Sequence, residues 1–137
     1  MLFIDGTWRG ADSNATFETS NPATGEVIGT VADAGAGDVE AAIAAASAAF
    51  SGWAGQTAYV RSAILRDAYS LMVDRKERLA KLMTEEQGKP LKAARNEVQY
   101  AADFLLWFSE EAKRVYGSTI PAPRSDQRFI TMQQPVG

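Results

Sequence analysis

The chain has 137 residues, the size of one ordinary domain, and a formal net charge of −3. Hydrophobic residues make up 46% and charged residues 23%, which is typical of a globular protein and excludes a disordered chain. Basic residues occur only in short groups such as "DRKER" (74–78), and no apolar run approaches the ~20 residues needed to cross a bilayer. We therefore expect no nucleic-acid partner, no membrane partner and a cytoplasmic location.

The first 35 residues predict two β-hairpins. In "LFIDGTW" (2–8), two apolar runs flank the dipeptide Asp5-Gly6, which tolerates the positive φ of a tight turn. A second pair of short alternating strands flanks "NPATGE" (21–26), in which asparagine, proline and glycine favour a turn.

Apolar residues then recur every three or four positions, which predicts helices. We expect these helices at residues 38–53, 58–75, 74–87 and 91–116. The stripes predicted to be buried are Val39, Ile43, Ala46 and Phe50 in the first helix, Val60, Ile64, Leu65, Ala68 and Leu71 or Met72 in the second, and Ala94, Val98, Ala101, Leu105, Phe108, Ala112 and Val115 in the last.

Local signals predict where these helices begin and end. Thr57 is a predicted N-cap, and Asp74 and Glu77 have the spacing of a capping box, with aspartate in place of the usual serine or threonine. Gly88 is predicted to end the third helix in the left-handed conformation, and Gly117 to close the last one.

The last twenty residues predict extended structure. Two prolines in "STIPAP" (118–123) exclude a helix, and residues 127–135 alternate in the manner of a strand. Because a lone strand leaves its edge groups unpaired, we expect this strand to need a sheet that the rest of the chain does not obviously supply.

The chain contains no cysteine and no histidine. It therefore lacks a thiolate nucleophile, an imidazole base and the usual ligands of zinc. Any catalysis by these residues alone has to use carboxylates, lysines, tyrosines or hydroxyls, which excludes a Ser-His-Asp enzyme.

Six motifs in a fixed order resemble the start of the aldehyde dehydrogenase superfamily. They are "IDGTW", "NPATGEVIGTV", "DVEAAIAAASAAFSGW", "EEQGKPLKAARNEV", "YGSTIPAP" and "QPVG". Within the superfamily, "FLLWFSEEAKRVYGSTIPAP" (104–123) is most similar to the succinate-semialdehyde dehydrogenase branch.

This resemblance implies an α/β parent with a Rossmann-like cofactor domain, a catalytic domain and a β-strand extension for oligomerisation. Residues 1–120 are expected to be the hairpins and helices of the cofactor-binding domain, and residues 121–137 the start of the oligomerisation arm. The expected structure here is mostly α-helical, with N-terminal β-hairpins and a C-terminal β-strand. The parent is expected to oxidise a small aliphatic aldehyde, succinate semialdehyde, with NAD or NADP, as a homodimer or homotetramer.

In the family pattern, the attacking cysteine, the glutamate base and the groups that hold the dinucleotide all lie beyond Gly137. We therefore expect no catalytic or cofactor-binding residue here, an inactive isolated chain without tight dinucleotide binding, and a chain end that is not a natural domain end. The alternative is a non-catalytic helical interaction module that uses its terminal strand to pair with a partner. We also expect the apolar stripes to be exposed in isolation, which makes the chain prone to aggregation.

The resemblance implies two sites. Glu86 matches a position that binds a monovalent cation with backbone carbonyls near Thr19 and Ser20; the alternative is that Glu86 is a solvated helical acid beside Glu85. Tyr100 matches the mouth of the aldehyde tunnel. The alternative for Tyr100 is core packing, as for the other aromatic residues nearby, Phe104, Trp107 and Phe108. Three basic residues, Lys89, Arg95 and Arg114, are better explained by solvated surfaces than by contacts to phosphate or substrate.

Overall fold

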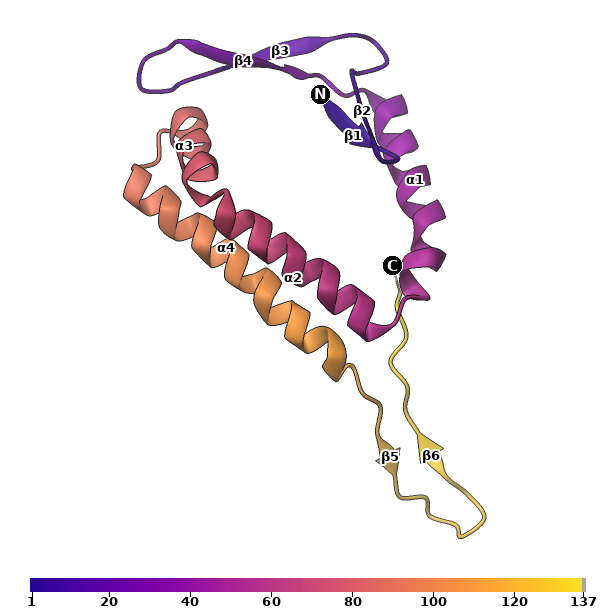
Figure 1. Ribbon diagram of the computed structural model, residues 1–137. Coiled ribbons are helices and arrows are strands. Elements are labelled where there is room, and N and C mark those ends of the chain that lie inside the picture. The colour runs from indigo at the N-terminus through magenta and orange to yellow at the C-terminus, as the bar shows by residue number, and fades with distance from the viewer. Residues whose placement is uncertain (137) are drawn as a thin grey trace.

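The computed structural model describes residues 1–136, which are mainly helical (Figure 1). The strands form three separate antiparallel pairs, and the described part of the chain contains no parallel sheet. In chain order the elements are β1 (Leu2–Ile4), β2 (Thr7–Arg9), β3 (Thr16–Ser20), β4 (Val27–Ala32), α1 (Ala36–Ala54), α2 (Ala58–Asp74), α3 (Lys76–Gln87), α4 (Leu91–Glu111), the 3-10 helix η1 (Ala112–Arg114), β5 (Thr119–Ile120) and β6 (Phe129–Ile130). The mostly helical fold with N-terminal hairpins is therefore confirmed.

The first hairpin turns at the dipeptide that predicts it. Asp5 (φ 50°) and Gly6 (φ 74°) both have positive φ, and such turns match the twist of the paired strands. Phe3 lies opposite Trp8, with ring centroids 5.0 Å apart. This cross-strand aromatic pair adds to the stability of the hairpin.

The second hairpin packs its turn against the end of α3. Gly25 takes φ 76° in the turn, as its sequence context predicts. The register of β3 and β4 shifts between Thr19 and Ser20, where the ladder is locally interrupted. A β-carbon added to Gly88 would lie only 3.1 Å from Cγ of Pro22, so the hairpin turn and the end of α3 are in direct contact.

Helices α2, α3 and α4 pack together as a helical body, in which α2 and α4 run antiparallel (Figure 1). Its core cluster consists of Ala80, Ala94 and Val98, and the half-buried side chains around it are Met72, Leu79, Met83 and Leu91. Small residues at the centre let the helix backbones approach closely.

The buried face of α4 departs from the predicted stripe beyond Val98, which is 3% exposed. Ala102 and Ser109 are buried, whereas Ala101 and Phe108 are exposed. The predicted stripe contained Ala101 and Phe108, whereas the buried face is turned by one position to Ala102 and Ser109. The small side chains of these two residues suit the close approach of α2 and α4.

Two of the predicted helix boundaries, at Thr57 and Gly88, are confirmed, and the capping box predicted at Asp74 is wrong. The Thr57 hydroxyl accepts the N–H of Val60 at 3.3 Å, and Gly88 has the left-handed conformation with φ 73°. The capping box does not form, because Asp74 is still the last residue of α2 and cannot take the extended conformation of an N-cap. Arg75 links the two helices and provides no side-chain cap.

Helix α4 ends at Glu111, followed by η1, and does not continue to Tyr116 as predicted. Gly117 is required for a different reason from the predicted one. A β-carbon added at Gly117 would overlap the carbonyl oxygen of Thr131, so the two backbones touch there.

The C-terminal segment forms a hairpin within the chain. Ile120 in β5 pairs with Phe129 in β6, and Thr131 donates its N–H to the carbonyl of Ser118 at 2.8 Å. The prediction of a lone strand over 127–135 is therefore wrong, because the proline-rich segment before it supplies the partner strand. Figure 1 shows this β5–β6 arm projecting from the end of the helical body.

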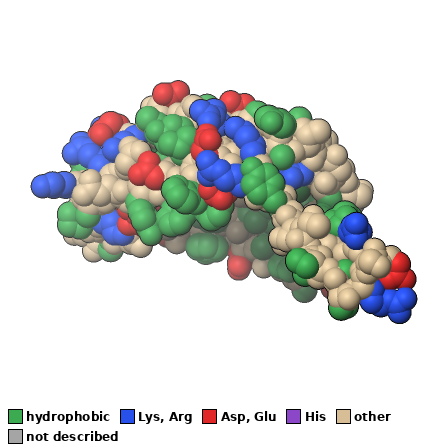
Figure 2. Space-filling view, turned by 90° about the horizontal axis from the view of Figure 1, so that it is seen from below, with side chains coloured by type: hydrophobic (Ala, Val, Ile, Leu, Met, Phe, Trp, Pro, Cys, Tyr) green, Lys and Arg blue, Asp and Glu red, His purple; other side chains and the backbone are tan. Residues whose placement is uncertain are grey.

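Helix α1 lies apart from the helical body, and β1 is its principal neighbour (Figure 1). The predicted buried stripe of α1 is largely exposed: the side chain of Ile43 is 64% exposed. Figure 2 shows hydrophobic side chains on the surface of the helical body and of the arm. Within residues 1–136, no helix is long and apolar enough to cross a membrane.

Candidate functional site

The predicted cation ligands lie on two segments that contact each other. Glu86 is in the last turn of α3, two residues before Gly88, and α3 contacts β3, which carries Thr19 and Ser20. The ladder irregularity at Thr19 and Ser20 leaves backbone groups of this strand pair outside the regular hydrogen bonding. Carboxylate and carbonyl oxygens are the ligands that hard cations prefer. The described residues offer no alternative cluster of three acidic, histidine or cysteine side chains for a metal.

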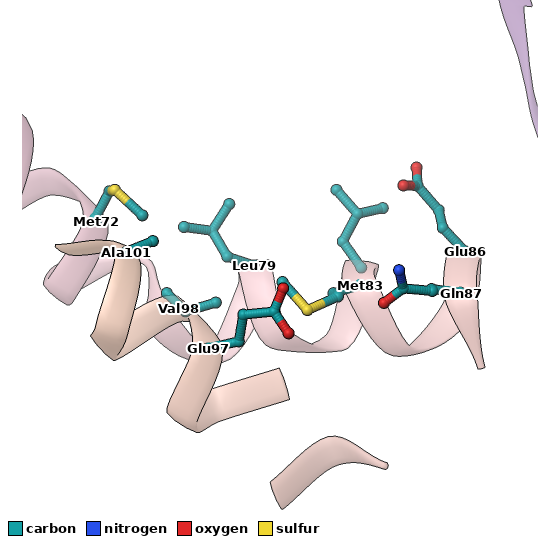
Figure 3. A pocket seen from close by; sticks show the side chains of 9 residues that line it. Met72, Leu79, Met83, Glu86, Gln87, Glu97, Val98 and Ala101 are labelled. Carbon is teal, nitrogen blue, oxygen red and sulfur yellow. The ribbon is translucent and has the colours of Figure 1, made fainter. Parts of the chain in front are cut away.

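A groove of about 370 Å³ lies between α3 and α4, beside Glu86. Its lining residues are Met72, Leu79, Leu82, Met83, Glu86, Gln87, Glu97, Val98 and Ala101. Figure 3 shows the Glu86 carboxylate at the outer end of the groove, away from Met72 and Ala101. Glu97 is ion-paired with Lys89, whereas Glu86 has no ion pair or hydrogen bond among residues 1–136. Of the two groove carboxylates, Glu86 is therefore the one available to a cation.

Tyr100 belongs to an aromatic patch on α4, made of Tyr100, Phe104, Trp107 and Phe108. Tyr100 meets Phe104 edge to face at 4.9 Å, and Phe104 stacks on Phe108 at 6.3 Å. These four side chains and Asp103 line a shallow cavity of about 280 Å³. Tyr100 is 65% exposed, so it lies outside the core of the described residues.

The aromatic patch offers no positive charge to a substrate. Its only charged lining residue is Asp103, which accepts a hydrogen bond from Gln99 at 2.9 Å. An aldehyde with a second, anionic group would therefore need its cationic partner from elsewhere.

The other basic candidates of the sequence are paired with carboxylates on the surface. Lys89 pairs with Glu97, Arg114 with Glu111, and Arg95 binds Glu77 through two nitrogen atoms at 2.9–3.0 Å. The hydrogen bond from Arg95 lowers the pKa of the Glu77 carboxyl below its ordinary value. These ion pairs join neighbouring turns and helices, which agrees with the interpretation of these residues as part of a solvated surface.

Asp38 is a buried polar residue whose role the sequence only partly indicates. It is 2% exposed, and its carboxylate accepts the N–H of Gly35 at 3.0 Å, the N–H of Asp12 at 3.2 Å and a guanidinium N–H of Arg9 at 3.1 Å. The helix predicted over 38–53 begins at this residue, which places an acid in its first turn. The sequence cannot predict the contacts to Arg9 and Asp12, which come from the preceding hairpin and loop.

Another cavity, of about 360 Å³, combines segments far apart in the chain. Its lining residues are Trp53, Ala54, Arg61, Val115, Gln133, Gln134 and Pro135. The spacing of these residues carries no motif, so only the folded chain brings them together.

The described residues do not fit a dinucleotide. A Rossmann-type site binds the pyrophosphate of a dinucleotide at a parallel βαβ unit, with glycines between the first strand and the helix. Strands β1 to β6 form antiparallel pairs only. At the start of α1, the N–H of Gly35 is already taken by the Asp38 carboxylate. No step of a hydride transfer can be derived from these residues.

The fold and its motifs agree with one family. A model of the aldehyde dehydrogenase family matches residues 8–137, and the chain belongs to this family. The family resemblance carried by the six sequence motifs is thereby confirmed.

Two of the similar proteins are aldehyde dehydrogenases that are named for their substrates. The chain is 50% identical over its whole length to a glutarate-semialdehyde dehydrogenase of Pseudomonas putida strain KT2440. It is 46% identical, again over its whole length, to the NADP(+) succinate-semialdehyde dehydrogenase of Escherichia coli K12. The chain spans 28% of the length of each of these relatives.

A solved structure of an aldehyde dehydrogenase from Brucella melitensis biovar abortus 2308 has the same fold. It matches 93% of this chain with a TM-score of 0.92 at 48% identity, and the match covers 26% of that chain. The α/β parent expected from the sequence is consistent with this likeness.

Proposed function

We propose that this chain is the N-terminal portion of an NAD(P)-dependent aldehyde dehydrogenase whose substrate is succinate semialdehyde or a close homologue of it. The main support is the identity of 46–50% over all 137 residues to relatives named for succinate and glutarate semialdehydes. Both names describe a short aldehyde with a carboxylate at its other end. The proposed assembly is a homo-oligomer joined through the β5–β6 arm, in which Ile120 pairs with Phe129.

The chemistry divides between this chain and the rest of such a protein. Oxidation of an aldehyde to an acid needs a nucleophile, a base and a hydride acceptor. The chain has no cysteine or histidine, and its residues do not fit a dinucleotide. Its proposed contributions are therefore one aromatic wall of the substrate tunnel, a cation site and the arm.

An absorbance assay of NAD(P)H formation tests the proposal. We expect the 137 residues alone to show no aldehyde-dependent reduction of NAD or NADP. A protein that carries this chain at its N-terminus and has the full length of the relatives should prefer succinate or glutarate semialdehyde to butanal by at least tenfold in kcat/KM. Sedimentation should show this protein as an oligomer. Activity of the isolated chain, or an equal kcat/KM for butanal, would contradict the proposal.

We infer that Tyr100 lines the aldehyde tunnel, because its ring is exposed and continues an aromatic patch. Truncation to alanine in the full-length protein removes apolar contact with the substrate chain, so Tyr100→Ala should raise KM several-fold. The matched control is Tyr59→Ala, since Tyr59 is as exposed as Tyr100 but lies at the start of α2. An unchanged KM for Tyr100→Ala would remove Tyr100 from the tunnel.

We also infer that Glu86 binds a monovalent cation together with main-chain carbonyls of Thr19 and Ser20. The support is the contact between α3 and β3 and the unpaired state of Glu86 within residues 1–136. At equal ionic strength, potassium or sodium chloride should raise the Tm above that in choline chloride. Glu86→Gln should abolish this difference and Glu85→Gln should keep it. The same cation dependence in Glu86→Gln would refute the site.

A further inference from the structure

The cavity of about 360 Å³ lies where three distant parts of the chain meet. Trp53 and Arg61 come from the two sides of the junction between α1 and α2, Val115 follows η1, and Gln133 and Pro135 belong to the C-terminal segment. Figure 1 shows this C-terminal segment running back beside the end of α1. The volume is at the lower end of the roughly 300–1,000 Å³ typical of small-molecule sites.

Arg61 is the only charged residue in the lining. Its guanidinium donates one hydrogen bond, to the carbonyl of Gln56 at 2.5 Å, and forms no ion pair within residues 1–136. This bond holds one side of the guanidinium against the α1–α2 junction and leaves its other N–H donors for a ligand. A guanidinium with free donors binds planar carboxylates through two parallel hydrogen bonds.

The uncharged lining residues determine which other groups a ligand of Arg61 should carry. Trp53, Ala54, Val115 and Pro135 provide apolar surface, and the side-chain amides of Gln133 and Gln134 add hydrogen-bond donors. No carboxylate is present in this lining to repel an anion. An apolar cavity with a single cation and two amides suits a small acid whose body is hydrophobic.

We propose that this cavity binds a small carboxylic acid, with the carboxylate on the Arg61 guanidinium and the apolar body against Trp53 and Val115. The site is separate from the aromatic patch that contains Tyr100, since the two cavities share no lining residue. It rests on the geometry of the cavity and does not depend on the proposed catalytic activity.

Tryptophan fluorescence of the 137-residue chain tests this site with sodium benzoate as the probe. These 137 residues contain three tryptophans, so Trp8→Phe and Trp107→Phe together leave Trp53 as the reporter. Benzoate should change the emission of Trp53 in a saturable manner. Benzamide, which has the same shape without the charge, should bind at least tenfold more weakly, because hydrogen bonds to charged groups are the stronger ones. Inorganic phosphate, which lacks the apolar body, should also bind more weakly.

Variants locate the binding and keep the test decisive. Arg61→Gln should lose benzoate binding, and Arg61→Lys should weaken it because lysine lacks the planar fork. The matched control is Arg128→Gln, since Arg128 also bonds only a main-chain carbonyl but lies outside the cavity, and it should bind as the parent does. If Arg61→Gln does not fold, Val115→Phe decides: this exposed position tolerates a larger ring, which would fill the cavity and block binding while Arg61 remains and Trp53 stays the reporter.

Three results would overturn the proposal. They are benzamide or phosphate binding as tightly as benzoate, unchanged benzoate binding in folded Arg61→Gln, and unchanged binding in Val115→Phe. None of these measurements requires turnover. If benzoate does not bind at Arg61, the proposed dehydrogenase activity is unaffected, and if that activity is absent, the proposed acid-binding cavity is unaffected.

Discussion

Helices α1 and α4 have similar lengths, 19 and 21 residues, but are held in place in different ways. Helix α4 buries Ala94, Val98 and Ala102 against α2 and α3. In α1 the only buried residue is the polar Asp38, and the apolar Ile43 faces outward. The same three- and four-residue spacing of apolar side chains therefore accompanies a packed helix in one case and an exposed one in the other.

This difference separates two sources of helix stability. Alanine has the highest helix propensity, and the alanine-rich α1 combines this propensity with the carboxylate cap of Asp38. Helix α4 owes its stability to tertiary packing, as most protein helices do. Substitutions should therefore act on α4 through packing and on α1 through its first turn.

The largest expected effect is at the packed helix. Ala94 is fully buried against Ala80 and Val98, so Ala94→Leu overpacks the core and should lower the free energy of unfolding by about 1–3 kcal/mol. Ala46→Leu in the exposed α1 should change it by less than ~0.5 kcal/mol, because both residues are good helix formers. Equilibrium urea unfolding measures both values. Equal losses would show that α1 is as tightly packed as α4.

An intermediate effect is expected at the start of α1. Asp38→Ala removes the cap and the links to Arg9 and Asp12, which should cost about 0.5–2 kcal/mol. Hydrogen exchange of residues 2–12 should accelerate, since the hairpin loses its attachment to the helix. Glu40→Ala, an exposed acid in the same helix, is the control. Unchanged exchange in Asp38→Ala would mean that β1 and β2 are held by other contacts.

The smallest effect concerns the exposed ion pair between α3 and α4. Because the hydrogen bond from Arg95 lowers the pKa of Glu77 in the folded state below its ordinary value of 4.5, the pair stabilises the fold above pH 4.5. This contribution is lost as the pH falls through the lowered pKa. The Tm of the parent should therefore exceed that of Glu77→Gln at neutral pH, and the difference should vanish in acid. A difference that grows in acid would contradict this sign.

The sequence predicts those features of the fold that neighbouring residues determine. Asp5-Gly6 makes its turn, Thr57 caps its helix and Gly88 ends one, because each acts within about four residues of itself. The burial of Ala102 and the pairing of β5 with β6 could not be predicted in this way. Both depend on which distant segment approaches, and single-chain periodicity contains no information about that.

The candidate sites follow the same division. The contact between the segments of Glu86 and Ser20 was available from the family resemblance, because motifs in a fixed order imply a known arrangement. The acid site around Arg61 was not, since Trp53 and Gln133 are eighty residues apart in the printed sequence and share no motif. Chemistry shared with a family is therefore readable from the sequence, and a cavity between unrelated segments requires the fold.

The contact between Gly117 and Thr131 has a consequence for mutational tolerance. Residue 117 is exposed and has no side chain to contribute to a site, so a survey of substitutions would be expected to find it permissive. Any side chain at this position would instead force apart the two backbones at the base of the β5–β6 arm. Intolerance at residue 117 would thus report the geometry of the arm, and it should not be mistaken for the signature of a binding residue.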